Sequence, residues 1–252
     1  MIFTNLIQTN LETSFIGRDI EYYSFTDSTN DDAFELISND EAINGMIIIT
    51  DYQKKGRGRR NNTWISSPGN NLTFSLILKE PDKQRLGLFS ILSGIAIVKG
   101  IKKFTNIQCS LKWPNDIMLN NKKIGGVLIE TKNKDSHIYG VIGIGININQ
   151  QELPKELQSI ASSLRIENSN PIQREPLLAF ILNEFEKLYI SDTDKWIATW
   201  KECCNHLDKK ITFHKNDDLI EGHFINIDNN GNAIININSK ETLISSGVLE
   251  IS

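Results

Sequence analysis

Two glycine-containing segments of the sequence concentrate cationic side chains at a spacing that suits the binding of anions. The first reads Lys54-Lys-Gly-Arg-Gly-Arg-Arg60, and its glycines let the backbone approach a ligand closely while the guanidinium groups converge on it. The second reads Lys122-Lys-Ile-Gly-Gly126, where small residues leave space beside an ammonium group. The first segment predicts a site for phosphate or carboxylate groups. Taken singly, the first segment also fits a solvated basic loop or an arm that touches nucleic acid. The second also fits a hairpin with exposed lysines.

Two further segments combine polar side chains with a rigid or closely packed backbone. In Lys112-Trp-Pro-Asn-Asp116, Pro114 excludes Trp113 from the helical region and so predicts a rigid, extended turn. Such a turn holds a lysine and two polar side chains in fixed relative positions, although a strand end with a stacked Trp gives the same pattern. Gly143-Ile-Gly-Ile-Asn147 is too short for a dinucleotide-binding fingerprint. It predicts only a strand against which another group packs closely.

The elements that position these segments follow from the hydrophobic pattern. Lys54 to Gly69 shows no periodicity and is predicted to be a long loop, a length that is typical of functional or disordered segments. Helical periodicity predicts a helix capped by Ser28, a buried helix over 86–104, and helices over 173–189 and 193–205. Strand patterns predict a buried strand over 46–50, an alternating strand over 71–78 and a strand over 137–149. Between the last two strands we expect a hairpin, with strands over 116–119 and 124–131 and its turn at 120–121.

The composition changes after about Leu207, and only short strands with an Asn230-Gly231 hairpin turn are predicted from there to the end. Helices and a mixed sheet followed by a short all-β tail predict an α+β protein of two domains, over 1–206 and 207–252.

Composition narrows the function classes. The chain has 252 residues, 39% hydrophobic and 23% charged, which is globular, and its net charge of −4 makes nucleic acid a poor default partner. Three cysteines, two of them adjacent, form no disulfide framework, and the four histidines show no zinc-binding spacing. No apolar run is long enough to cross a bilayer and no signal peptide is evident, so we expect a cytoplasmic protein without a membrane partner.

Taken together, the order and spacing of these segments resemble the catalytic region of biotin–protein ligases. The resemblance runs from about Leu11 to Leu164, and more loosely to the C-terminus. It is carried by Ser28-Thr-Asn30, Tyr52-Gln53, the GRGRR run, Trp64, Ser67-Pro-Gly69, KWPND, KKIGG and GIGIN. It implies a class II synthetase-like catalytic domain of the lipoate–biotin ligase type, followed by a small C-terminal β-barrel.

The resemblance also implies the reaction. Biotin and Mg-ATP would give biotinyl-5′-AMP and pyrophosphate, and the lysine of a biotin carboxyl carrier protein or domain would then take the biotinyl group. Mg²⁺ would enter with ATP, without protein side chains predicted as metal ligands. No DNA partner is expected, and the chain would be a monomer or a homodimer.

By match to the family motifs, Lys123 would sit beside the biotin carboxylate and the α-phosphate, Arg59 would close the loop over the intermediate, and Arg57 would contact biotin and phosphate. The predicted biotin-binding residues are Ser28, Thr29, Asn30, Gln53, Arg57, Gly58, Arg59, Lys123 and Gly126. The predicted ATP-binding residues are Trp64, Lys112, Asn115 and Asn147. At Asn61-Asn62 the sequence departs from the family, which commonly has Gly-Arg there. Asn tolerates the left-handed conformation that a glycine supplies.

Four alternatives stay open at this point. A lipoate–protein ligase shares the fold, but its RRxxGGG-like loop is missing here. A repressor form carries an N-terminal helix-turn-helix, and about ten residues precede Leu11, too few for one. A non-catalytic biotin-binding protein would keep the pocket without the chemistry. An RNA-binding protein that uses the basic arm lacks interleaved aromatic residues.

Overall fold

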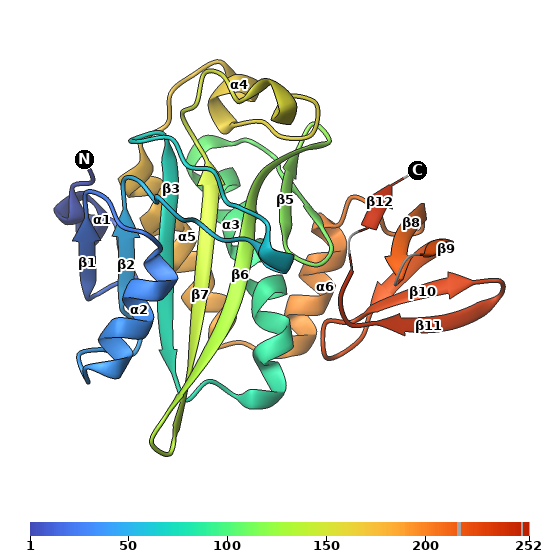
Figure 1. Cartoon of the computed structure of the whole chain (residues 1–252), viewed down its shortest axis with the longest axis horizontal. Coiled ribbons are helices and arrows are strands. Elements are labelled where there is room, and N and C mark those ends of the chain that lie inside the picture. The colour runs from blue at the N-terminus through green and yellow to red at the C-terminus, as the bar shows by residue number, and fades with distance from the viewer. Residues whose placement is uncertain (216–217, 248, 252) are drawn as a thin grey trace.

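The computed structural model describes residues 1–215, 218–247 and 249–251 and contains two sheets (Figure 1). The larger sheet has seven strands in the order β1-β2-β3-β7-β6-β5-β4, in which β1 and β2 are parallel and the other pairs are antiparallel. Its strands are β1 (Ile20–Tyr23), β2 (Ile47–Thr50), β3 (Asn71–Lys79), β4 (Ser110–Lys112), β5 (Asp116–Leu119), β6 (Lys122–Lys134) and β7 (His137–Asn147).

Helices cover both faces of this sheet. They are α1 (Thr4–Thr9), α2 (Thr29–Ser38), α3 (Phe89–Thr105), α4 (Leu164–Asn168), α5 (Arg174–Tyr189) and α6 (Thr193–Cys203), with 3₁₀ turns η1 (Arg59–Asn61), η2 (Lys83–Leu88) and η3 (Lys155–Leu157). In Figure 1, α3 and α5 lie behind the sheet, where they form the main hydrophobic core, and α2 lies in front. A smaller core lies between α2 and β2, β3 and β7.

This double cover explains the burial of β3. A strand covered on one face alternates between buried and exposed residues, whereas β3 is buried from Asn71 to Leu78 because helices or a loop lie over both faces. The strand predicted over 71–78 is confirmed, and both of its faces are buried. Residues of odd and even number face opposite layers: Phe74 joins the main core and Ile77 joins the core under α2.

Most predicted elements are confirmed within one or two residues of their bounds. Three details differ. The helix predicted over 86–104 begins as the 3₁₀ turn η2 and becomes α3 at Phe89, and β6 is longer than predicted. Ser28 occupies the N-cap position of α2, but its side chain accepts no hydrogen bond from the helix backbone. In the hairpin turn, Asn120 and Asn121 have φ values of 48° and 63°, as expected for Asn in a left-handed conformation.

The C-terminal part of the chain forms a five-stranded antiparallel sheet in the order β11-β10-β9-β8-β12. Its strands are β8 (Lys210–Lys215), β9 (Asp218–Ile227), β10 (Ala233–Ile237), β11 (Lys240–Ile244) and β12 (Leu249–Ile251). This sheet confirms the predicted small C-terminal β region, although no pairing between β11 and β12 closes it into a barrel among the described residues. The boundary at 206/207 falls between α6 and β8 and stays a prediction.

No helix in the described ranges is both long and apolar enough to cross a membrane.

Candidate active site

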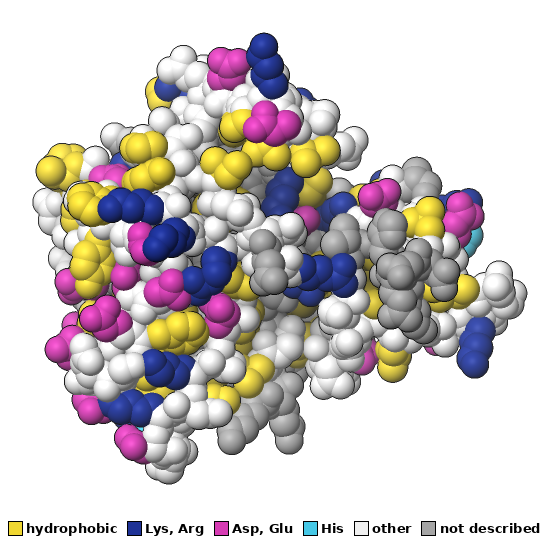
Figure 2. All heavy atoms as spheres, in the orientation of Figure 1, with side chains coloured by type: hydrophobic (Ala, Val, Ile, Leu, Met, Phe, Trp, Pro, Cys, Tyr) yellow, Lys and Arg dark blue, Asp and Glu magenta, His cyan; other side chains and the backbone are white. Residues whose placement is uncertain are grey.

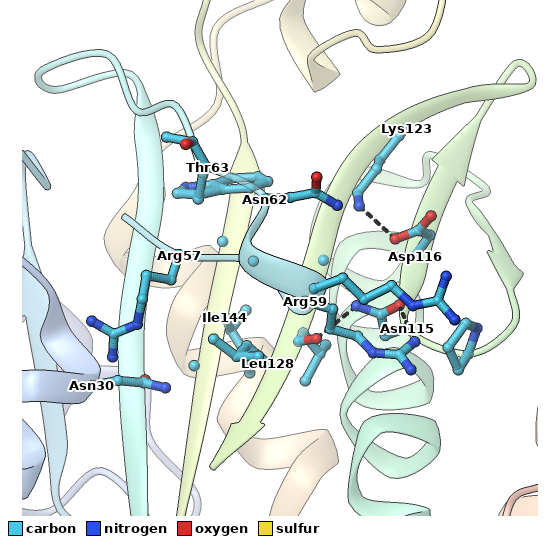
Figure 3. A pocket seen from close by; sticks show the side chains of 18 of the residues that line it. Asn30, Arg57, Arg59, Asn62, Thr63, Asn115, Asp116, Lys123, Leu128 and Ile144 are labelled. Carbon is cyan, nitrogen blue, oxygen red and sulfur yellow. Dashed lines mark hydrogen bonds and ion pairs between the residues drawn. The ribbon is translucent and has the colours of Figure 1, made fainter. Parts of the chain in front are cut away.

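A cavity of about 370 Å³ lies on the face of the large sheet that also carries α2. Figure 3 shows its lining, and Figure 2 shows Lys and Arg side chains near the middle of this face, between the two sheets. Its walls come from segments far apart in the sequence: the first turn of α2, the basic loop between β2 and β3, the 112–116 segment, β6 and β7. The C-terminal sheet contributes Gly247 and Leu249, a contribution that no sequence signal indicated.

All but one of the residues predicted for the site line this cavity. They are Ser28, Thr29, Asn30, Gln53, Arg57, Gly58, Arg59, Trp64, Lys112, Asn115, Lys123 and Gly126. Asn147 is the exception. It is buried at the end of β7, where its amide accepts from Asn71 Nδ2 (2.9 Å) and Gln150 Nε2 (3.0 Å) and donates to the Ser162 carbonyl (2.9 Å). The contacts of Asn147 therefore hold the strand end together.

The floor of the cavity is glycine-rich because side chains from outside the sheet lie directly on it. A Cβ at Gly145 would come within 2.4 Å of the Trp64 ring, and one at Gly143 within 2.5 Å of Asn30 Oδ1. The expectation that a group packs closely on the GIGIN strand is thus confirmed, and the groups are Trp64 and Asn30. Trp64 Nε1 is buried and has no hydrogen-bond partner among the described residues, so it keeps a free donor.

One end of the cavity is uncharged and polar. Gln53 Oε1 accepts from the Thr29 backbone N–H (2.8 Å) and lies 3.0 Å from Thr29 Oγ1. Ser75 Oγ lies 2.7 Å from Thr29 Oγ1 and 2.6 Å from Asn30 Oδ1. These four side chains are almost fully buried. Hydroxyl and amide groups held in this way suit a ligand ring with hydrogen-bonding groups and no charge.

The other end is cationic. Lys123 Nζ lies 2.5 Å from Asp116 Oδ1, and Arg59 Nη1 donates to Asn115 Oδ1 at 3.2 Å. Asn115 is itself fixed, because its Nδ2 donates to the Val127 carbonyl (2.8 Å). Burial lowers the pKa of Arg59 from its usual value, and the neighbouring Arg60 adds to the effect. The Arg59 guanidinium therefore lies at the cavity wall with the neutral Asn115 amide as its hydrogen-bond partner. This arrangement suits the binding of an anion.

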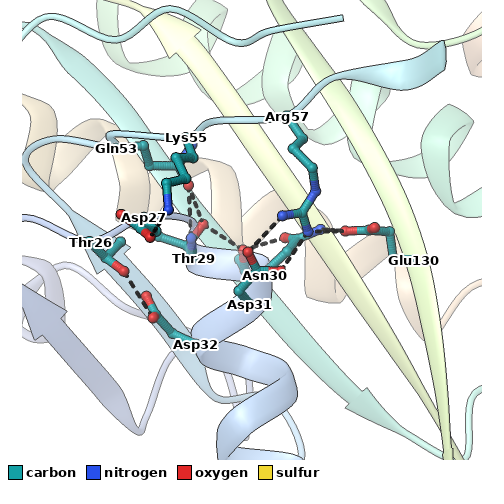
Figure 4. A network of polar contacts seen from close by, with 11 residues as sticks. Thr26, Asp27, Thr29, Asn30, Asp31, Asp32, Gln53, Lys55, Arg57 and Glu130 are labelled. Atoms are coloured by element: carbon teal, nitrogen blue, oxygen red, sulfur yellow. Dashed lines mark hydrogen bonds and ion pairs between the residues drawn. The ribbon is translucent and has the colours of Figure 1, made fainter. Parts of the chain in front are cut away.

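Arg57 does not join this cationic end. Its guanidinium donates to both oxygens of Asp31 (2.6 and 2.7 Å) and lies 3.4 Å from Glu130 (Figure 4). The hydrogen bond to Asp31 is the main cause of its raised pKa. Figure 3 shows Arg57 on the side of Asn30, across the cavity from Lys123.

The loop around the sequence departure adopts a different turn from the one expected. The left-handed residue is Arg60 (φ 56°), whereas Asn62 has φ −66° and lines the cavity. The side chain of Asn61 lies outside the described residues, so the prediction for it is not addressed.

The 112–116 segment is held from behind by the C-terminal part of the chain. The Trp113 indole is 1% exposed, and its Nε1 donates to the Gly231 carbonyl (2.9 Å) in the turn between β9 and β10. The Trp113 backbone N–H donates to His206 Nε2 (3.4 Å). His206 is itself buried against Phe224 of β9, with ring centroids 4.4 Å apart. The peptide bond before Pro114 is cis.

Comparison with known proteins places this site in a family. The model of the biotin/lipoate A/B protein ligase family matches residues 22–147, which is half of the chain. The chain belongs to this family. The matched segment holds every predicted site residue, from Ser28 to Asn147.

Individual members of the biotin/lipoate ligase family agree with this assignment. The bifunctional ligase/repressor BirA of Bacillus subtilis is 39% identical over 188 residues, which cover 73% of this chain and 57% of that protein. BirA of Escherichia coli is 26% identical over 226 residues, 87% of this chain and 70% of that protein. The chain thus spans little more than half of the Bacillus relative. The biotin protein ligase from Aquifex aeolicus in complex with biotin and ATP superposes with a TM-score of 0.80 at 26% identity, covering 93% of this chain and 99% of that one.

Three carboxylates at this family site were missed by sequence reasoning. Asp116 belongs to the KWPND segment, so the sequence did give a reason to expect it near Lys123. Asp31 follows the Ser28–Asn30 segment directly. Glu130 lies on the same face of β6 as Gly126 and Leu128 by alternation, but nothing in the sequence shows that Asn30 and Arg57 meet it.

Proposed function

We propose that the chain is a biotin–protein ligase that activates biotin with Mg-ATP and transfers the biotinyl group to the acceptor lysine of a biotin carboxyl carrier domain. The observation that carries this proposal is a single cavity with an uncharged, amide-rich end and a cationic end. A ligand with a neutral polar ring at one terminus and a carboxylate at the other fits such a cavity lengthwise, with room beside the carboxylate for a nucleotide phosphate.

The cationic end suits adenylation. The biotin carboxylate and the α-phosphate are both anions, and at ~4 Å their repulsion is about 1 kcal/mol in water and several-fold larger in a protein site. Lys123, Arg59 and Lys112 would relieve this repulsion and stabilise the charge that develops at phosphorus. The carboxylate oxygen forms the new bond to phosphorus, and pyrophosphate leaves with the bonding electron pair.

The remaining residues have supporting roles in this proposal. Ser28, Thr29, Asn30 and Gln53 would bind the ureido ring, and Trp64 would cover the adenine and supply its free Nε1 donor. Asn115 would contact the nucleotide beside Arg59. Because the amide of Asn147 is engaged in the strand-end contacts, it would shape the nucleotide side of the site from below.

Mg²⁺ would enter with ATP and neutralise phosphate charge. Within the described ranges no group of three His, Cys, Asp or Glu residues is placed to hold a metal ion. Asp116 faces the cavity and offers carboxylate oxygens, the ligand type that Mg²⁺ prefers, so it would contribute one contact to a metal held mainly by the phosphates.

The transfer step needs no nucleophile from this chain. The carrier amine attacks the carbonyl carbon of the mixed anhydride, a C–N bond forms, and the bond from that carbon to the AMP oxygen breaks. What the chain would supply is exclusion of water, and the part of the basic loop that lines the cavity, between Arg57 and Trp64, would do so.

Two measurements on the purified chain test the proposal. We expect ATP–pyrophosphate exchange that depends on biotin and is not supported by lipoate, and we expect biotinylation of an added carrier domain. Exchange with lipoate alone would reassign the chain to lipoate chemistry. Tight biotin binding by calorimetry without exchange would leave a non-catalytic binding protein.

A further inference from the structure

Glu130 lies just outside the cavity and has a contact that the adenylation chemistry does not use. Its Oε2 accepts from Asn30 Nδ2 at 2.6 Å, and its carboxylate is 30% exposed on β6. Asn30 lies over Gly143 and lines the cavity floor, so Glu130 acts on the cavity through Asn30 (Figure 4).

The contact fixes which way round the Asn30 amide lies. A carboxylate accepts hydrogen bonds and does not donate them, so Asn30 must present its NH₂ to Glu130 and its oxygen to Ser75. Gln53 is fixed in the same way at the far end of the row, because its Oε1 accepts from the Thr29 backbone N–H. If the Asn30 amide flipped, its oxygen would face the Glu130 carboxylate, and if the Gln53 amide flipped, its NH₂ would face the Thr29 backbone N–H.

Between these fixed amides lies a row of four oxygen atoms. Three oxygen–oxygen contacts join Asn30 Oδ1, Ser75 Oγ, Thr29 Oγ1 and Gln53 Oε1, at 2.6, 2.7 and 3.0 Å. Gln53 Oε1 already accepts from the Thr29 backbone N–H, so both hydroxyl protons can point towards Asn30. Asn30 Oδ1 then accepts from Ser75 and keeps a second lone pair for a donor from a ligand.

We infer that Glu130 is a positioning residue that makes this end of the cavity selective for ligand rings carrying N–H donors. It does so by holding the Asn30 carbonyl oxygen on the floor, where it can accept a hydrogen bond from a ring N–H. The inference rests on the proposed function and extends it from a cavity that accepts a polar ring to one that selects rings with N–H groups.

The substitution Glu130→Gln tests this mechanism with little change of shape. The introduced glutamine amide can donate as well as accept, so the Asn30 amide is free to rotate and its NH₂ then satisfies Ser75 internally. The floor then presents an amide N–H where wild type presents the Asn30 oxygen. We expect biotin to bind roughly tenfold more weakly, with kcat at saturating biotin within about threefold of wild type, because the cationic end is unchanged.

The decisive probe is the pair of cyclic carbamate analogues of biotin, in each of which one ring N–H is replaced by oxygen. For wild type we expect calorimetry to show at least one carbamate binding about 10- to 100-fold more weakly than biotin. In Glu130→Gln this ratio should fall to within about threefold. The double variant Asn30→Asp/Glu130→Gln exchanges the two side-chain types, keeps an acceptor-only group facing Ser75, and should restore a ratio of at least about tenfold.

Asp31→Asn separates this role from the contact of Glu130 with Arg57. Asp31 makes the closer contacts to the Arg57 guanidinium, whereas it is Glu130 that accepts from the Asn30 amide. We expect this variant to keep the wild-type ratio. A wild-type ratio in Glu130→Gln, a lost ratio in Asp31→Asn, or no restoration in the double variant would each overturn the inference while leaving the ligase proposal intact. Absence of biotin binding by wild type would instead overturn the proposed function.

Discussion

At the residue level, three of the cations that line the cavity differ in how readily they can meet a ligand. Lys123 is paired with Asp116 but is 39% exposed, and exposed ion pairs are weak enough to exchange partners. Arg59 has a neutral amide partner and a pKa lowered by burial, so an incoming anion stabilises its charge. Arg57 is held by carboxylates across the cavity. Lys123 and Arg59 are therefore the cations best placed for chemistry.

Arg59→Gly should separate formation of the adenylate from its retention. We expect pyrophosphate release to continue, because Lys123 remains, while the adenylate escapes through the weakened loop and hydrolyses. The ratio of pyrophosphate released to biotin transferred should rise about tenfold. Lys55→Gly is the matched control, since it adds a glycine to the same loop at a residue that pairs with Asp27 outside the cavity lining. An equal rise in both variants would show that loop flexibility, and not the Arg59 charge, causes the leak.

Most residues that line the cavity were predictable, because their types and order in the sequence suit the binding of a ligand. The carboxylates that orient them were not. Glu130 and Asp31 reach Arg57 from a strand and a helix that are distant in sequence, and their geometry exists only after the sheet and α2 have packed.

At the level of elements, β7 leaves space for side chains of other segments to pack directly against its backbone. Its glycines are required at 143 and 145, where Asn30 and Trp64 occupy the space of a side chain. Hydrophobic periodicity predicted the strand, and the glycines predicted a close approach. Neither could show that the approaching group is an indole from the basic loop.

Gly145→Ala should displace the Trp64 indole from the floor of the cavity. Because ring atoms lie within 2.4–2.8 Å of the added Cβ, the ring must move, and we expect the KM for ATP to rise roughly tenfold. Gly140→Ala is a control in the same strand, where the nearest neighbouring atom lies at 3.4 Å. A KM that is unchanged in Gly145→Ala, measured by pyrophosphate release, would contradict a role for this packing.

At the scale of the whole molecule, the two sheets are joined through the back of the active site. Trp113 bonds to Gly231 and His206, and the C-terminal sheet adds Gly247 and Leu249 to the cavity. Composition predicted a separate β region here but could not show that it lines the cavity. Such contacts between distant segments leave no local pattern in a sequence.

His206 should make the stability of the molecule depend on pH. Burial, with Lys112 and Lys209 nearby, lowers its pKa from 6.5 to about 4 in the folded state. The unfolded chain therefore binds a proton first as the pH falls, so this contribution to stability is complete above pH 6.5 and is lost progressively towards pH 4. Between about pH 7.5 and about pH 5 wild type should lose about 2 kcal/mol more unfolding free energy than His206→Gln, measured by urea denaturation. Parallel pH profiles would contradict this assignment.

Biotin-dependent pyrophosphate release from Mg-ATP shows whether Lys123 and its neighbours adenylate biotin in this cavity. The comparison is wild type, Lys123→Ala and Lys122→Ala, since the adjacent lysine stands outside the cavity lining. We expect release with wild type and Lys122→Ala, and a loss on the order of 10²–10³-fold in Lys123→Ala, the size typical of removing an electrostatic donor from such a transition state. Equal rates in the two variants, or release that does not depend on biotin, would contradict the account.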